Sequence, residues 1–389
     1  MKKIGFLINP VAGLGGQAGM KGSDCAGGRR IAAGLGYKKT AGTRAYECIR
    51  QIREEEGLRV IAPEGEMGGD VLAAANIPYE KIRTGRPADR EIISGKAPGE
   101  REVTTREDTL RYAKILKNQG IDLLVFCGGD GTARDICEAV EDHVPVLAVP
   151  AGVKMYSACY AVSPYQAGTL LRDFIRGRQM NFDYREVMDI DEKDLEDPSV
   201  SPVLYGFLQS LSDGIRIQKA KEICRGDVSG REELADYIIS AMEEDFLYII
   251  GPGGTTYCLK KRLEGEGTLR GVDVARGRKI VLKDGNEKEI FRLLEEGVPA
   301  KIIVTCLGGN GFLFGRGNQQ ISPRIIRRVT KENLILAVTK EKLLSLRSAP
   351  MLVDTGDRET DRYLCGYYKI GVNHHETVLY KIDISNSSA

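Results

Sequence analysis

The chain has 389 residues, and its 56 lysines and arginines nearly balance 55 aspartates and glutamates, for a formal net charge of +1. Without an excess of charge, the protein has no strong attraction for nucleic acid or an anionic membrane, and we expect neither as a partner. The length is typical of two or three domains, and 42% hydrophobic residues supply enough apolar material for more than one core.

The nine cysteines never form a C-x-x-C pair, and only three histidines are present, which argues against a zinc site or a disulfide framework. Scattered cysteines in odd number are typical of a reducing compartment. The apolar run from Ile4 to Ile8 is too short for a signal peptide, and no run reaches membrane-spanning length. We therefore expect a cytoplasmic protein.

The first part of the chain predicts strands that alternate with helices. Arg106–Gln119 has the apolar spacing of a helix, which Gly120 would end. Such alternation is typical of a parallel sheet covered on both faces. We expect residues 1–165 to form an α/β nucleotide-binding domain, with buried strands at Ile4–Ile8, Leu58–Ala62, Ile121–Cys127 and Val144–Val149.

From Phe182 onward, short segments with β-like alternation become more frequent, at Asp183–Asp191, Val203–Ser210 and Leu269–Val274. We therefore expect residues 166–300 to form a β-rich substrate domain. After Lys301, strands and helices alternate again, and the chain ends in a hairpin that turns near Asn373. We expect residues 301–389 to pack back on the first domain.

The strongest functional signal is a buried strand, Leu123–Cys127, that runs into Gly128-Gly129-Asp130-Gly131-Thr132. Ligands of open α/β sheets bind at the carboxyl ends of strands, where this loop must lie. Glycines let backbone N–H groups approach a phosphate, and the N-terminus of the next helix adds partial positive charge. Asp130 could accept a proton from a hydroxyl or help to hold a magnesium-bound nucleotide. The same residues could instead form a plain turn, with Thr132 as the helix N-cap.

Gly128–Thr132 resembles the GGDGT signature of the superfamily that contains NAD kinases, diacylglycerol-type lipid kinases and, more distantly, phosphofructokinases. Asn9-Pro10-Val11-Ala12-Gly13 is similar to the N-P-x-x-G loop that ends the first strand in these proteins, and Pro150-Ala151-Gly152 lies where they have a further substrate or nucleotide loop. The resemblance implies that three loops meet at one edge of the sheet. It also implies nucleotide binding by Asn9, Pro10 and Gly13 together with Gly128, Gly129, Gly131 and Thr132.

The second half of the chain favours NAD kinases among these relatives. Gly251–Tyr257 is similar to their T-P-T-G-S-T-A-Y loop, whereas the T-I-D-N-D segment of phosphofructokinases is missing and the lipid-kinase patterns match only in part. Over nearly its full length the chain resembles ATP-NAD kinase-like proteins of the acetoin-catabolism protein X (AcoX) type. The resemblance implies a Rossmann-like, phosphofructokinase-like N-terminal α/β domain and a β-rich second domain of the NAD kinase type.

The expected acceptor side of the site comes from several loops. The resemblance places Gly152, Lys154, Gly254, Thr255 and Thr256 there. Lys154 departs from the G-x-L-G-F loop of ordinary NAD kinases; it could neutralise a phosphate or be a solvated loop cation. The Asn-Glu pair that contacts the nicotinamide nucleotide in those enzymes is also missing from its usual place.

The glycine-rich run Gly308–Gln320 follows an expected strand and adds two more candidate residues. Arg316 offers a fork for phosphate or carboxylate, and Asn318 offers an amide that can read a base or a carboxamide. Gly13–Ala18 fits the G-x-G-x-x-A fingerprint of hydride-transfer enzymes, but the glycines that follow argue against the helix that such a cofactor site requires.

The resemblance implies an ATP-dependent kinase that uses Mg²⁺ with ATP, and in which Asp130 deprotonates or orients the acceptor hydroxyl. The first acceptor to test is NAD, through its ribose 2′-hydroxyl, to give NADP. Alternative acceptors are another nucleoside-like or polyol hydroxyl and a lipid hydroxyl. Polyphosphate is an alternative donor. A regulatory protein that binds nucleotide without turnover is the alternative to an enzyme. We also expect a homo-oligomer.

Overall fold

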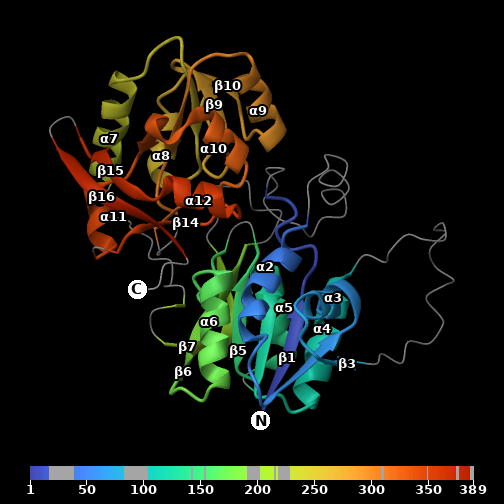
Figure 1. Ribbon diagram of the computed structural model, residues 1–389. Helices are drawn as coiled ribbons and strands as arrows, with labels where there is room; N and C mark the ends of the chain where they lie inside the picture. Colours follow the sequence, from blue (N-terminus) through green and yellow to red (C-terminus); the bar gives the residue numbers. More distant parts are fainter. Residues whose placement is uncertain are drawn as a thin grey trace, which may run out of the picture.

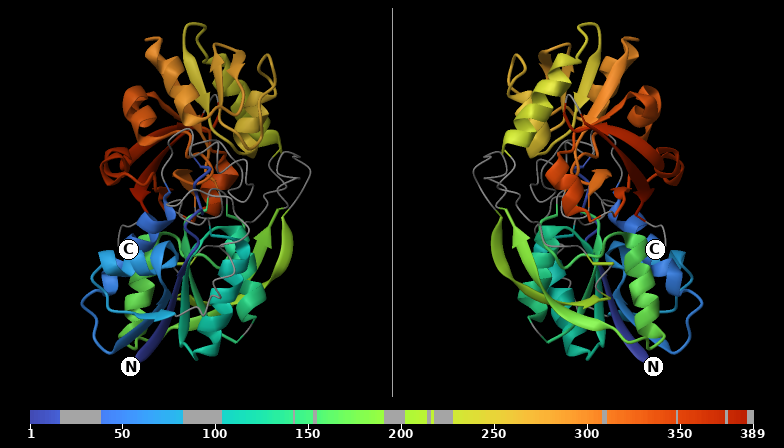
Figure 2. Two further views of the ribbon diagram at one scale, coloured as in Figure 1. Left: turned by 90° about the vertical axis from the view of Figure 1, so that its right-hand side faces the viewer. Right: turned by 90° about the vertical axis from the view of Figure 1, so that its left-hand side faces the viewer.

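The computed structural model describes residues 1–16, 39–82, 104–141, 143–152, 155–190, 202–213, 216–217, 228–307, 311–347, 349–373 and 376–385. These residues form two domains of mixed α/β structure, which lie one above the other (Figures 1 and 2). The first domain has a seven-stranded sheet, and the second has one sheet of five strands and one of four. The expected α/β fold class is confirmed.

The first sheet has the strand order β3-β2-β1-β4-β5-β7-β6. Ile8 lies opposite Cys127, and Gly128 lies opposite Pro150, so the carboxyl ends of β1, β4 and β5 are neighbours. Five neighbouring strands of this sheet run parallel: β1 (Lys2–Ile8), β2 (Leu58–Pro63), β3 (Glu80–Ile82), β4 (Leu123–Gly128) and β5 (Val146–Pro150).

Helices cover both faces of this sheet because successive side chains of β4 point into two different cores. Leu123, Val125 and Cys127 pack with α2 (Ala41–Ile49), α3 (Gly69–Ala74) and α6 (Pro164–Ile175). Leu124 and Phe126 pack with α4 (Arg106–Asn118) and α5 (Asp130–Val140). The helix expected at 106–119 is therefore present, and β4 is buried along its whole length.

The first sheet continues beyond residue 165, where the sequence analysis placed the domain boundary. β6 (Asn181–Asp189) and β7 (Val203–Ser212) form an antiparallel hairpin, and β7 joins β5 in parallel at Val146 and Ser210. Val187 and Leu208 pack in the core that contains α5. Their β-like alternation was correctly recognised, but a two-residue period does not reveal which sheet a hairpin joins.

The five-stranded sheet of the second domain has the order β10-β9-β8-β11-β13. α7 (Val228–Ser240) and α8 (Gly254–Lys260) pack on one side of it, and α9 (Glu287–Glu295) and α10 (Pro323–Val329) pack on the other. Its strands are β8 (Leu247–Ile250), β9 (Asp273–Arg276), β10 (Lys279–Leu282), β11 (Ala300–Val304) and β13 (Leu334–Leu336).

The four-stranded sheet, in the order β12-β14-β16-β15, completes the second domain. Val304, Met351 and Ile382 share one core, so residues after 301 complete the second domain. Asp354 and Arg358 of the same segment also contact the first domain. The elements concerned are β12 (Phe312–Phe314), α11 (Lys340–Ser345), β14 (Met351–Val353), α12 (Arg358–Leu364), β15 (Gly366–Gly371) and β16 (Thr377–Ile384). The last two strands form the expected terminal hairpin.

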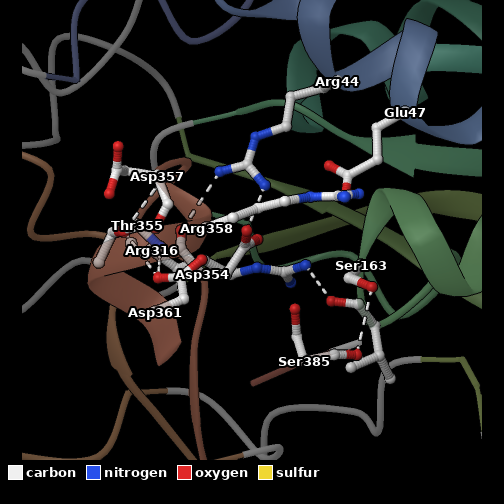
Figure 3. Close-up of polar contacts among 12 residues, drawn as sticks. Arg44, Glu47, Ser163, Arg316, Asp354, Thr355, Asp357, Arg358, Asp361 and Ser385 are labelled. Carbon is white, nitrogen blue, oxygen red and sulfur yellow. Dashed lines mark hydrogen bonds and ion pairs between the residues drawn. The ribbon is translucent and has the colours of Figure 1, made fainter. Parts of the chain in front are cut away.

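Ion pairs join the two domains. Arg44 of α2 lies 2.5 Å from a carboxylate oxygen of Asp354, which follows β14, and it also donates to the Asp354 backbone carbonyl at 3.3 Å (Figure 3). The exposed fractions of these side chains are only 16% and 10%. Arg358 and Glu47 form a second pair at 3.4 Å. Charged groups from distant parts of the chain therefore fix the contact between the domains.

Replacing Arg44 with alanine should reduce the free energy of unfolding by about 3 kcal/mol or more, because Asp354 would remain buried without its partner. Arg59→Ala is a matched control, since Arg59 pairs with Glu80 on the surface and surface pairs contribute little. Urea denaturation of the two variants and the wild type provides the comparison. Equal losses of stability in both variants would contradict the importance of the buried pair.

Candidate active site

Three loops meet at the carboxyl ends of β1, β4 and β5. Asn9, directly after β1, donates a hydrogen bond from its side-chain amide to Thr132 Oγ1 at 2.9 Å. Gly13 has a φ of +76°, and a Cβ there would lie 2.2 Å from the Ala151 carbonyl oxygen. The first loop therefore contacts both of the others, and Gly13 fits for two reasons: its backbone conformation and its close approach.

The second and third loops touch backbone to backbone. A Cβ on Gly129 would lie 3.1 Å from the Gly152 Cα, and a Cβ on Gly152 would lie 2.8 Å from the Gly129 Cα. A Cβ on Gly128 would lie 2.4 Å from the Thr132 side chain. The convergence that the sequence motifs predict is thus present, and these glycines allow it. Pro10 lies in the turn after Asn9, and Gly131 is the second residue of α5.

α5 begins at Asp130, three residues earlier than the sequence suggests, with Gly129 in an extended conformation as its N-cap residue. Thr132 therefore lies inside the first turn and is not the N-cap, and its side chain accepts the hydrogen bond from Asn9. The Asp130 side chain is buried. Its two carboxylate oxygens accept hydrogen bonds from the backbone N–H groups of Tyr156 at 2.6 Å and Ser157 at 3.0 Å.

Burial raises the pKa of Asp130 to about 7, since a charged carboxylate is poorly solvated there. Hydrogen bonds from Ser157 and Tyr156 act in the opposite direction, and the negative charge of Asp189 raises the pKa further. A carboxyl group with a pKa near neutrality can take up and release a proton at physiological pH. This is an electrostatic property of a general base or acid.

The second domain contributes the loop Gly251–Tyr257 after β8. Gly253 has a φ of +131° and donates from its N–H to the Leu269 carbonyl at 3.0 Å. Gly254 is exposed and Thr255 is half-buried, whereas the buried Thr256 donates from its hydroxyl to the Gly253 carbonyl at 3.0 Å. Of the two threonines, Thr255 is therefore the one with a partly accessible side chain.

Arg270, next to Leu269, connects this loop with the Asp130 region. Burial raises the pKa of Tyr156 and the Arg270 guanidinium lowers it, so Arg270 lies near the residue that donates to Asp130. A buried ion pair between Lys260 and Asp273, at 2.7 Å, holds the Arg270 segment, since Lys260 also donates to the Gly271 carbonyl at 2.9 Å. Sequence reasoning missed Arg270, because it stands in a segment read as a strand.

Arg316 lies at the contact between the domains (Figure 3). Asn318 makes its side-chain hydrogen bonds within its own loop. Arg316 donates to the Val162 carbonyl and lies 4.3 Å from the centre of the Phe312 ring. Burial lowers its pKa to about 10, although Asp354 raises it. Asn318 accepts from the Gly315 N–H at 3.1 Å and donates to the Leu313 carbonyl at 2.7 Å. These contacts are structural, and Lys154 lies outside the described residues.

Within the described ranges, no group of three or more His, Cys, Asp or Glu side chains is placed to hold a metal ion. Mg²⁺ that binds with a nucleotide usually takes only one or two protein carboxylates, and most of its ligands are phosphate oxygens and waters. In the same part of the chain, no helix combines the length and the apolar character that crossing a membrane requires.

Replacing Gly129 with alanine should weaken ATP binding by about tenfold, because the added Cβ forces the second and third loops apart. Gly42→Ala is the control: Gly42 lies in α2, and a Cβ there meets nothing closer than 3.8 Å. Calorimetric titration of both folded variants with ATP gives the affinities. An affinity of Gly129→Ala equal to that of Gly42→Ala would contradict a tight fit at this point.

Both halves of the chain match models of known protein families. Residues 4–179 match the ATP-NAD kinase N-terminal domain, and residues 243–382 match the ATP-NAD kinase C-terminal domain. A search of curated proteins and a search of solved structures each return no match. The two matched ranges cover most of the sequence and contain the three converging loops and the loop after β8. The chain belongs to the ATP-NAD kinase family.

Proposed function

We propose that the protein transfers the γ-phosphoryl group of ATP to a hydroxyl of a small acceptor, with the ribose 2′-hydroxyl of NAD as the first choice. The family indicates a phosphotransferase of the NAD kinase type. The observation that carries the proposal is a buried carboxyl group, Asp130, at the point where three glycine-containing loops meet.

The loops suit the phosphates of a nucleotide. Gly129 and Gly152 expose backbone without side chains, so N–H groups there can approach phosphate oxygens closely. The N-terminus of α5 adds partial positive charge at the same place. Asn9, Pro10, Gly13, Gly128, Gly131 and Thr132 are proposed to complete the nucleotide site.

Asp130 is proposed as the general base. Its carboxylate takes the proton of the acceptor hydroxyl, the hydroxyl oxygen forms a bond to the γ-phosphorus, and the bond from that phosphorus to the β–γ bridging oxygen breaks. ADP leaves, and Asp130 later releases its proton to solvent. Magnesium bound to ATP would offset phosphate charge, but the described residues do not form a metal site, so this scheme assigns none of them to it.

The acceptor is proposed to lie between Asp130 and the second-domain loop with Gly254, Thr255 and Thr256. Arg270 supports an acceptor that carries phosphate, as a dinucleotide does, because a guanidinium binds phosphate with paired hydrogen bonds. Gly152 and Lys154 remain proposed contacts on this side. Arg316 and Asn318 have structural contacts and are not included.

A panel of acceptors tests the substrate class. Purified protein is incubated with Mg-ATP or Mg-polyphosphate and with NAD, NADH, nucleosides, polyols or a short-chain diacylglycerol, and phosphorylated products are identified by mass spectrometry. We expect NADP from NAD and ATP. Phosphorylation of the lipid alone would contradict the proposed acceptor, and tight ATP binding without any product would support the regulatory alternative.

Asp130→Asn should reduce the turnover number by roughly a hundredfold, the usual contribution of general base catalysis, while ATP affinity changes little. Asp70→Asn is a matched control, since Asp70 also follows two glycines at the start of a helix but is exposed. Steady-state kinetics and calorimetry separate the two effects. Turnover of Asp130→Asn within a few fold of Asp70→Asn would remove Asp130 from the mechanism.

The rate should also fall as the pH decreases through about 7. The pKa of Asp130 is raised to about 7, so below this pH the group is mostly protonated and cannot accept a proton from the acceptor. Above it, the carboxylate predominates and the rate reaches a plateau. A profile of kcat/KM against pH measures this, and full activity at pH 5 would be inconsistent with such a base.

The cysteines support the expected cytoplasmic location. All seven that lie among the described residues are free thiols, as is usual in a reducing compartment. We propose this location on that ground.

A further inference from the structure

The end of β6 is tied to the loop that binds Asp130. The Ser157 hydroxyl donates to the Met188 carbonyl at 3.0 Å and accepts from the Met188 N–H at 3.1 Å. The next N–H along the loop, that of Ala158, donates to the Glu186 carbonyl at 2.9 Å. Because the Ser157 N–H binds Asp130, the position of β6 determines where this donor lies.

Asp189, the last residue of β6, is connected to the Asp130 region from a second direction. One of its carboxylate oxygens accepts from Arg134 Nη1 at 3.1 Å, and the other accepts from the Ile190 N–H at 2.9 Å. Arg134 lies four residues after Asp130, one turn further along α5. Asp189 is thus linked to Asp130 through α5 and through Ser157. It lies between the two ranges that match the family models.

We propose that Asp189 is a positioning residue for Asp130: its ion pair with Arg134 holds the end of β6 against α5, beside the Ser157 loop that binds Asp130, and places a second carboxylate in this region. This inference rests on the proposed function, in which Asp130 is the base. Neither β6 nor the ion pair between Asp189 and Arg134 is part of any of the sequence motifs.

The charges around Asp130 determine whether a substitution of Asp189 raises or lowers the pKa of Asp130. Asp189 of β6 disfavours the ionised carboxylate of Asp130. Arg134 of α5 carries the opposite charge and lies 3.1 Å from Asp189 and 3.6 Å from Asp135. Among the described residues, further titratable or charged groups near this region are Asp135 of α5, then Tyr156, Cys159 and Tyr160 after β5, and Arg270 of the second domain beyond Tyr156. Removing the charge of Asp189 deletes a negative neighbour and leaves Arg134 without this partner, and both changes favour ionisation of Asp130.

Asp189→Asn should therefore move the acidic limb of the kcat/KM profile to lower pH by about one unit, with a plateau near that of the wild type. Asp183→Asn is the matched control. Asp183 lies on the same strand and pairs with Arg185 at 2.8 Å, but it is six residues from Asp189, about 20 Å along the strand. Its profile should coincide with that of the wild type.

A direct titration of Asp130 does not depend on finding the acceptor. Protein labelled with ¹³C at the aspartate carboxyl carbon is titrated by NMR, and the Asp130 signal is identified by its loss in Asp130→Asn. We expect a lower pKa for Asp130 in Asp189→Asn and no change in Asp183→Asn. An unchanged or higher pKa in a folded Asp189→Asn protein would overturn the inference, whereas a missing kinase activity would overturn only the proposed function.

Arg134→Gln tests the removal of the positive charge instead of the negative one, and it tests the proposal if Asp189→Asn does not fold. This change removes the cation but leaves the Asp189 carboxylate, so the pKa of Asp130 should rise and the acidic limb should move to higher pH. A fall in the pKa of Asp130, or no change, would contradict the proposed roles of both residues.

Discussion

The contact between Gly129 and Gly152 is the constraint on which the proposed site depends. The parallel register places Gly128 opposite Pro150, so the loops after β4 and β5 leave the sheet side by side, and only residues without side chains allow their backbones to meet. This approach brings the Tyr156 and Ser157 N–H groups to the carboxylate at the start of α5. The position of Asp130 is therefore a consequence of backbone packing between two strands.

Burial and hydrogen bonding then oppose each other at Asp130, and burial has the larger effect, so its pKa lies near 7. The contact between the domains also affects the surroundings of Asp130. Arg44, Asp354 and Arg316 hold the second domain against α2 and Val162, and in this arrangement Arg270 lies near Tyr156. The chemistry of one loop thus depends on packing within the first domain and on charged contacts between the two.

The sequence predicted the strands and loops of the first domain well, because β4 is an uninterrupted apolar run that ends in glycines, and both properties are local. It also identified Asn9, Gly13 and Gly128–Thr132, which the structure brings together. The sheet to which β6 and β7 belong, and the proposed roles of Arg270 and Asp189, could not be predicted, since they depend on contacts between residues far apart in the chain. Arg316 and Asn318 make buried contacts that the sequence did not indicate, because a guanidinium or an amide suits a structural contact as well as a ligand.

The most direct test of the account is a crystal structure with NAD and a non-hydrolysable ATP analogue. Our account predicts the γ-phosphate at the three loops, against the N–H groups near Gly129 and Gly152, and the ribose 2′-hydroxyl of NAD within hydrogen-bonding distance of the Asp130 carboxylate. A γ-phosphate bound away from these loops, or a dinucleotide whose hydroxyl groups lie far from Asp130, would contradict it.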